Sequence, residues 1–152
     1  MHVCVDGNFH HHHLRSAGDL PSSYVSSLFI PKADVDAVGQ HISNVHIRPN
    51  PRQTHTSAID EAVNECERTY TAADGKKVKT NQAIFDDMGV MALLCRHDIP
   101  LFLANIDTPG EQQKYAVALI LHLFSLLPNH ATVTVLYDVG CVLSRATSQV
   151  CL

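Results

Sequence analysis

The sequence predicts an α/β protein built around one mixed sheet. Residues 2–9 and 132–137 form short apolar runs, each closed by an acidic residue, and both are expected to be buried strands. Two further apolar runs, 88–95 and 99–106, are separated by only three residues, which favours a hairpin. A helix over 111–127 has a broad apolar face, so it must pack on a sheet or on another subunit.

The order of these elements predicts the strand order. If the first three strands form an antiparallel meander, the third strand runs parallel to the first. A right-handed crossover through the helix at 111–127 then places strand 132–137 parallel to the first strand and beside it. The predicted order is 3-2-1-4, that of an incomplete RNase H-like mixed sheet.

Residues 15–86 are expected to form a long loop and helix insertion after the first strand, within one truncated domain that spans residues 1–152. Its first part is rich in Ser, Pro, Asn and His. Within it we predict one short strand at Tyr24–Ile30, a helix at Ala33–Ile42 behind Pro31 and a second helix at Ser57–Tyr70. The insertion is expected to be less ordered than the sheet and its helix.

Composition limits the classes of function. The net charge of −4 and the pI of about 6.2 give no basic footprint for nucleic acid. Five cysteines without a signal peptide indicate a reducing, intracellular compartment. The longest apolar run, Ala116–Leu121, is too short to span a bilayer, so no membrane association is expected.

Two acidic residues are candidates for a metal site. Asp6 and Asp138 each follow an apolar strand. Gly7 comes directly after Asp6, and Gly140 comes two residues after Asp138. Ligands of α/β sheets bind at the carboxyl ends of parallel strands, so adjacent strands would let the two carboxylates share a divalent ion. The alternative is that each aspartate is only a turn residue.

A second candidate site uses softer ligands. Cys95 and His97 lie at the expected end of strand 88–95, and Cys66 lies on the inserted helix, so the three could bind zinc. Cys141 or one of His10–His13 could be the fourth ligand. The alternative is that the cysteines are small buried hydrophobes, and Cys4 is expected to face the core.

Two local patterns complete the set of expectations. Thr108, Pro109 and Glu111 form a capping-box pattern that predicts the start of the long helix. The tract His10–His13 is expected to continue a strand or a hairpin rather than to bind metal.

The chain resembles the KDZ transposases of fungal genomes. The matching stretches follow the family order through nearly the whole chain: Asp6-Gly7-Asn8-Phe9, Glu61 to Glu67, Ala72 to Lys77, Gly89 to His97, Gly110 to Ala116 and Tyr137 to Cys141.

The resemblance implies a DDE-type enzyme with an RNase H-like fold, which uses two Mg²⁺ or Mn²⁺ ions to cut and join DNA. It implies that Asp6 is the first catalytic carboxylate and Asp138 the second, that DNA is the partner and that the protein is nuclear. A third acidic ligand is expected on a later helix, and no glutamate follows Glu111. The chain is therefore expected to be an inactive fragment whose exposed sheet edge favours self-association.

Two other functions stay open at this point. One is a non-catalytic binding or interaction module that derives from a transposase and is stabilised by zinc. The other is an unrelated metal-dependent hydrolase that uses Asp6, Asp138 and histidines.

Overall fold

The structure is a computed structural model that describes residues 1–18, 26–46, 82–110, 112–140 and 143. Its strands and helices follow the order predicted for the sheet and the long helix. In chain order they are β1 (His2–Asn8), β2 (His13–Leu14), the 3₁₀ helix η1 (Arg15–Ala17), α1 (Lys32–His46), the 3₁₀ helix η3 (Gln82–Ile84), β3 (Phe85–Asp87), β4 (Gly89–Cys95), β5 (Pro100–Ile106), α3 (Gln113–Leu126) and β6 (Thr134–Leu136).

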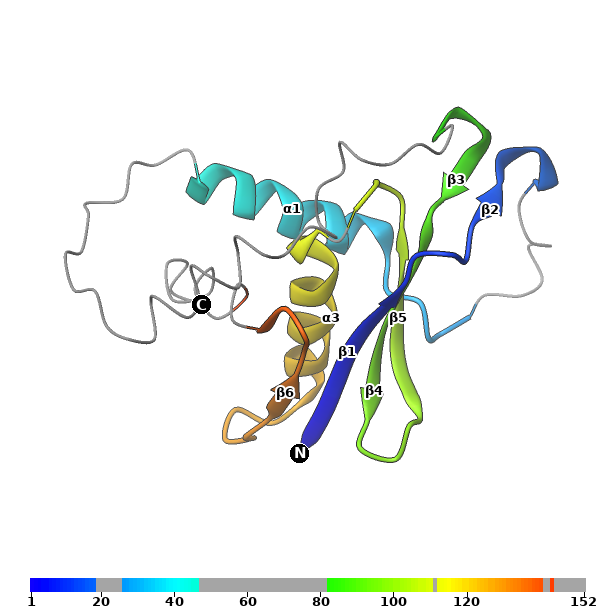
Figure 1. Cartoon of the computed structure of the whole chain (residues 1–152). Coiled ribbons are helices and arrows are strands. Elements are labelled where there is room, and N and C mark those ends of the chain that lie inside the picture. The colour runs from blue at the N-terminus through cyan, green and yellow to red at the C-terminus, as the bar shows by residue number, and fades with distance from the viewer. Residues whose placement is uncertain (19–25, 47–81, 111, 141–142, 144–152) are drawn as a thin grey trace.

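Four strands form a mixed sheet in the order β5-β4-β1-β6 (Figure 1). β4 pairs antiparallel with both β1 and β5, whereas β6 pairs parallel with β1. The predicted hairpin is confirmed, and its turn contains Asp98 at a φ of 61°. Because β1, β5 and β6 run in one direction, their carboxyl ends lie on the same side of the sheet, which we call the carboxyl edge.

The core lies between one face of this sheet and the two α-helices. α3 contacts β4 and β5, and α1 packs on α3 and on β5. Side chains alternate along β1, so Val3 and Val5 are buried beneath the helices. Ile30 and Val35 belong to the same core, so the segment around α1 is packed into the domain.

The other face of the sheet is more open. Its residues include Cys4, which lies on the exposed face of β1 between the two buried valines. The expectation that Cys4 faces the core is therefore wrong, because alternate residues of a strand point to opposite faces. Among the described residues, neither α1 nor α3 covers this face.

The start of the long helix also differs from the prediction. α3 begins at Gln113 after an N-cap at Gln112 that makes no side-chain cap, and Thr108 lies in the preceding loop. The Thr108 hydroxyl is hydrogen-bonded to the Tyr115 hydroxyl at 2.7 Å, so it is not used to cap a helix. The tertiary contact therefore overrides the capping pattern.

The inserted segment is described only in part. The helix predicted at 33–42 is confirmed and is longer, as α1. The strand predicted at 24–30 is reduced, within its described part, to a single bridge between Phe29 and Leu103. The helix predicted at 57–70 lies outside the described residues.

The histidine tract leads from β1 into a second, two-stranded sheet. β2 pairs antiparallel with β3, with His13 opposite Asp87. The predicted continuation into a strand is thus confirmed for His13, while His10 lies in a turn. In the part of the chain that the structure covers, no helix is long and apolar enough to cross a membrane.

Candidate metal centre

Asp6 lies on the open face of the sheet near the carboxyl edge. It is exposed between the buried Val5 and the partly buried Gly7, opposite Ala92 of β4. One of its oxygens, Oδ1, accepts a hydrogen bond of 2.7 Å from the Gly7 backbone N–H. This bond holds the carboxylate at the point where the strand nears its end.

Asp138 follows the neighbouring strand at the same edge. The β1–β6 register pairs His2 with Thr134 and Cys4 with Leu136, and the paired ladder ends there. The same offset carried two residues further would bring Asp138 opposite Asp6. Asp138 is exposed, and its Oδ1 accepts a hydrogen bond of 2.8 Å from the Val139 N–H.

The exposure pattern around the two aspartates is similar. Cys4 and Asp6 are exposed on β1, and Leu136 and Asp138 are exposed on and after β6, with buried or half-buried residues between them. Parallel neighbours in register point to the same face of a sheet. Asp138 lies in the turn that follows β6, and, as at Asp6, its carboxylate accepts the N–H of the residue that follows it.

Two carboxylates suit a hard divalent cation, because Mg²⁺ and Mn²⁺ prefer oxygen ligands. Within the described ranges, however, no group of three or more His, Cys, Asp or Glu side chains is arranged to hold a metal ion. Among the described residues, the two aspartates therefore have no third such side chain placed to share an ion with them.

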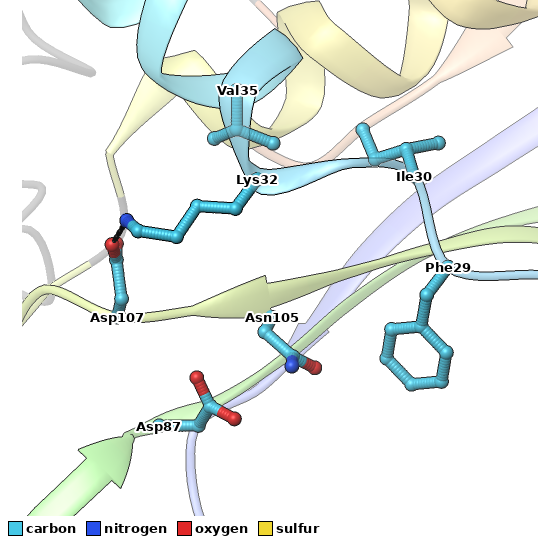
Figure 2. A pocket seen from close by; sticks show the side chains of 7 residues that line it. All are labelled: Phe29, Ile30, Lys32, Val35, Asp87, Asn105 and Asp107. Atoms are coloured by element: carbon cyan, nitrogen blue, oxygen red, sulfur yellow. Dashed lines mark hydrogen bonds and ion pairs between the residues drawn. The ribbon is translucent and has the colours of Figure 1, made fainter. Parts of the chain in front are cut away.

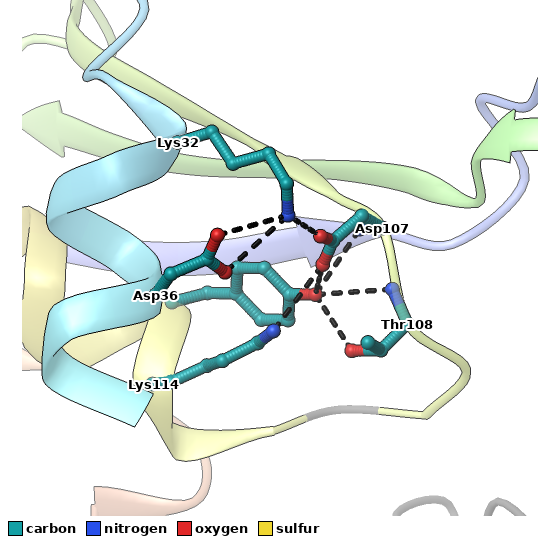
Figure 3. A network of polar contacts seen from close by, with 6 residues as sticks. Lys32, Asp36, Asp107, Thr108 and Lys114 are labelled. Carbon is teal, nitrogen blue, oxygen red and sulfur yellow. Dashed lines mark hydrogen bonds and ion pairs between the residues drawn. The ribbon is translucent and has the colours of Figure 1, made fainter. Parts of the chain in front are cut away.

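A third carboxylate lies at the carboxyl edge, after β5, and sequence reasoning missed its role. Asp107 is the centre of a group of polar contacts between α1, α3 and the loop after β5 (Figure 3). Lys32 of α1 forms an ion pair with Asp107 Oδ2, while Lys114 lies 3.2 Å from Oδ1. We call Lys32, Asp36, Asp107, Thr108, Lys114 and Tyr115 the Asp107 cluster.

Tyr115 completes the contacts of Asp107. Its buried hydroxyl donates to Asp107 Oδ1 at 2.6 Å and accepts the backbone N–H groups of Asp107 and Thr108, both at 3.1 Å. Burial raises the pKa of Tyr115 to about 12, and the hydrogen bond to Asp107 adds to this. Tyr115 is therefore a neutral donor that fixes the loop on α3.

The same contacts determine the charge state of Asp107. Burial alone would raise its pKa, but hydrogen bonds from Lys32, Tyr115 and Lys114 outweigh burial and lower the pKa to about 2. The hydrogen bond to Asp107 also raises the pKa of Lys32. Both Asp107 oxygens are thus occupied by internal donors, and we assign Asp107 to structure rather than to metal binding.

Beside this cluster is a small cavity of about 110 Å³ (Figure 2). Asp87 and Asn105 line it together with Asp107. Burial raises the pKa of Asp87, and the nearby His13 partly opposes this. The apolar part of the lining consists of Phe29, Ile30 and Val35.

The three predicted zinc ligands are described only in part. Cys95 Sγ and His97 Nδ1 lie 3.8 Å apart in and after β4, and Cys66 lies outside the described residues, as does Cys141. Because β4 is antiparallel to β1, this pair lies at the end of the sheet away from the carboxyl edge. The candidate zinc ligands and the two aspartates therefore belong to separate sites.

The fold and the two aspartates together describe a mixed α/β protein with a carboxylate at the end of each of two adjacent parallel strands. Comparison with protein families finds a match to the Kyakuja-Dileera-Zisupton (KDZ) transposase family over residues 1–152. The chain belongs to the KDZ transposase family, which makes DNA the partner that the family implies. No curated protein and no solved structure matches the chain.

Proposed function

We propose that Asp6 and Asp138 hold a divalent metal ion for the cutting and joining of DNA strands, in an RNase H-like domain of the DDE type. The observation that supports this most is the parallel pairing of β1 with β6, which brings both strand ends to one edge. Family membership supplies the substrate class and suggests a nuclear protein.

In this proposal the carboxylates of the chain bind the metal, and backbone N–H groups orient those carboxylates. The bound Mg²⁺ or Mn²⁺ supplies charge stabilisation to the attacking and leaving oxygens of an in-line displacement. The two carboxylates provide the oxygen ligands, and the N–H groups of Gly7 and Val139 hold one oxygen of each carboxylate in place. The second oxygen of each carboxylate is the one we assign to the metal.

Two carboxylates are too few to fix two metal ions in the geometry that the displacement needs. The net charge of −4 also gives no general attraction to phosphates. We therefore propose that a polypeptide of residues 1–152 does not cut DNA efficiently.

A plasmid-nicking assay with Mg²⁺ or Mn²⁺ tests this proposal. We expect at most trace nicking, which Asp6→Ala and Asp138→Ala each remove and which Asp98→Asn, in the β4–β5 turn, leaves unchanged. Efficient cleavage that both alanine variants lose would show that residues 1–152 contain a third ligand. Efficient cleavage that both variants keep would contradict the assignment of the two aspartates.

One observation favours a second candidate function, a binding module stabilised by zinc. The 3.8 Å separation of Cys95 Sγ and His97 Nδ1 allows both to ligate one ion after a small adjustment. We expect the purified protein to contain up to one zinc per chain, lost in Cys95→Ser and in His97→Ala but retained in Cys4→Ser. Elemental analysis of metal-free preparations exposed to zinc measures this, and equal zinc content in all variants would exclude the site.

A further inference from the structure

A shallow hollow of about 410 Å³ lies on the open face of the sheet, beside Asp6. Its size is within the range of pockets that bind small organic ligands. One side of the hollow is polar and the rest is apolar. The polar side consists of Asp6, Asn8 and His11, and the apolar lining includes Phe29, Val90, Ala92, Leu94 and Leu103.

Phe29 is held in this hollow by the backbone. Leu103 N–H donates to the Leu28 carbonyl at 2.7 Å, and Ile30 N–H donates to the Leu103 carbonyl at 2.9 Å. These two bonds attach the segment to the edge of β5, so Ile30 enters the core and Phe29 lies on the other face. The phenyl ring points away from Lys32 and Asp107 (Figure 2) and is 39% exposed.

Phe29 places a large aromatic ring at an exposed position on the open face of the sheet. Aromatic side chains are enriched at binding interfaces, and here the ring adjoins an apolar hollow. General precedent exists for this arrangement, because several nucleic-acid-binding domains stack bases on aromatic side chains of a sheet whose other face is covered by helices.

We propose that this hollow binds a nucleobase of a single DNA strand, with Phe29 as the stacking platform and the adjoining phosphate at Asp6. This inference rests on the proposed function, because the phosphate is placed at Asp6 by the metal assigned there. It adds the substrate contact: the flat faces of the base meet Phe29 and the apolar lining, and the sugar–phosphate lies on the polar side.

The polar side of the hollow is suited to the outer edge of a nucleotide. Asn8 Oδ1 accepts the His10 N–H at 3.0 Å, which orients the Asn8 amide and leaves its NH₂ group as a donor. His11 is exposed at the same side and offers an imidazole N–H. A nucleotide, which is apolar on its base faces and polar at its edges, matches this division better than an apolar peptide does.

Photo-crosslinking and binding of a short single-stranded oligonucleotide test the proposal. The probe carries one 5-iodouracil or 2-aminopurine, and binding is measured with Mn²⁺ present, because the proposal places the phosphate at a metal held by Asp6. Since stacking of one base is worth about 1–3 kcal/mol, Phe29→Ala should weaken binding by about 5-fold to 150-fold. Phe29→Trp should restore it, whereas Phe29→Leu should not.

The matched control is Phe124→Ala. It removes an exposed ring from α3, the helix that covers the other face of the sheet. Its binding should stay within about twofold of the wild type, as for most surface substitutions. The crosslink should map to Phe29.

Three results would overturn the proposal: no binding of the probe in the presence of Mn²⁺, unchanged binding by Phe29→Ala, or a crosslink that maps away from the hollow. Phe29→Leu keeps apolar volume, so it reports on stacking even if the alanine variant does not fold. A failure here is distinguishable from a failure of the metal assignment, because Mn²⁺ binding by the wild type and by Phe29→Ala is also measured without the oligonucleotide.

Discussion

At Asp107, burial and hydrogen bonding act on the pKa in opposite directions, and hydrogen bonding prevails. The pKa falls to about 2 although the side chain is only 22% exposed. The two lysines that achieve this come from different helices, since Lys32 begins α1 and Lys114 lies in the first turn of α3. The Asp107 cluster thus joins both helices to the end of β5.

This low pKa predicts a pH dependence of stability. An unfolded aspartate has a pKa near 4, so as the pH falls the unfolded chain takes up the proton first. The stabilisation is fully present above about pH 5 and is lost as the pH approaches about 2. We expect the wild type to lose about 2 kcal/mol more unfolding free energy over this interval than Asp107→Asn.

Urea unfolding at the two ends of this interval measures the difference. Asp98→Asn is the matched control, because Asn tolerates the positive φ of that turn as Asp does. It should keep the full pH dependence of the wild type. An Asp107→Asn variant with the same pH dependence as the wild type would show that the cluster does not control the charge of Asp107.

Local sequence pattern predicted some of these residues and not others. An apolar run closed by an acid singled out Asp6 and Asp138, and Asp107 follows strand 99–106 in the same way. That signal was present, but the partner Lys32 lies 75 residues earlier, so no local pattern connects the two. The sequence did not single out Phe29 for a similar reason. Its position depends on the backbone hydrogen bonds that its neighbours Leu28 and Ile30 form with the distant Leu103.

At the scale of elements, β4 passes very close to the end of β1. A Cβ atom added to Gly89 would lie 2.4 Å from the Asn8 carbonyl oxygen, which is backbone and cannot rotate away. Gly140 offers a comparison, because the nearest atom to an added Cβ there is 3.9 Å away in Tyr137.

We predict that Gly89→Ala lowers the free energy of unfolding by about 1–3 kcal/mol, the usual cost of forcing extra atoms into a packed site. Gly140→Ala should change it by less than about 0.5 kcal/mol. Thermal or urea unfolding of both variants measures this. Equal stability of the two variants would mean that β1 and β4 separate without cost at this point.

Periodicity predicted these elements better than it predicted their ends. The apolar runs located β1, β4, β5 and α3, while the alternation of exposed and buried residues along β1 was not predicted. The start of α3 was wrong because Thr108 bonds to Tyr115 instead of capping. The last strand is shorter than predicted, Thr134–Leu136 instead of 132–137.

At the scale of the whole molecule, the sheet has one covered face and, among the described residues, an outer strand without a neighbour. β6 ends the sheet order, and its Leu136 is 61% exposed. An exposed apolar edge strand favours pairing with another chain. Self-association through the β6 edge therefore stays a prediction.

We predict that the polypeptide of residues 1–152 associates at raised concentration and that Leu136→Lys reduces this association. A charge on an edge strand opposes edge-to-edge pairing. Sedimentation over a concentration series measures it, with Leu126→Lys, on the exposed end of α3, as the control. Association that only Leu126→Lys disrupts would place the contact on the helical side.

The shared metal of Asp6 and Asp138 is the central claim, and Mn²⁺ binding followed by electron paramagnetic resonance tests it most directly. The wild type should bind one Mn²⁺ per chain weakly, and Asp6→Asn and Asp138→Asn should each abolish that binding because the ion needs both carboxylates. Asp98→Asn, outside the site, should bind as the wild type does. Undiminished Mn²⁺ binding by both Asp6→Asn and Asp138→Asn would contradict the shared site.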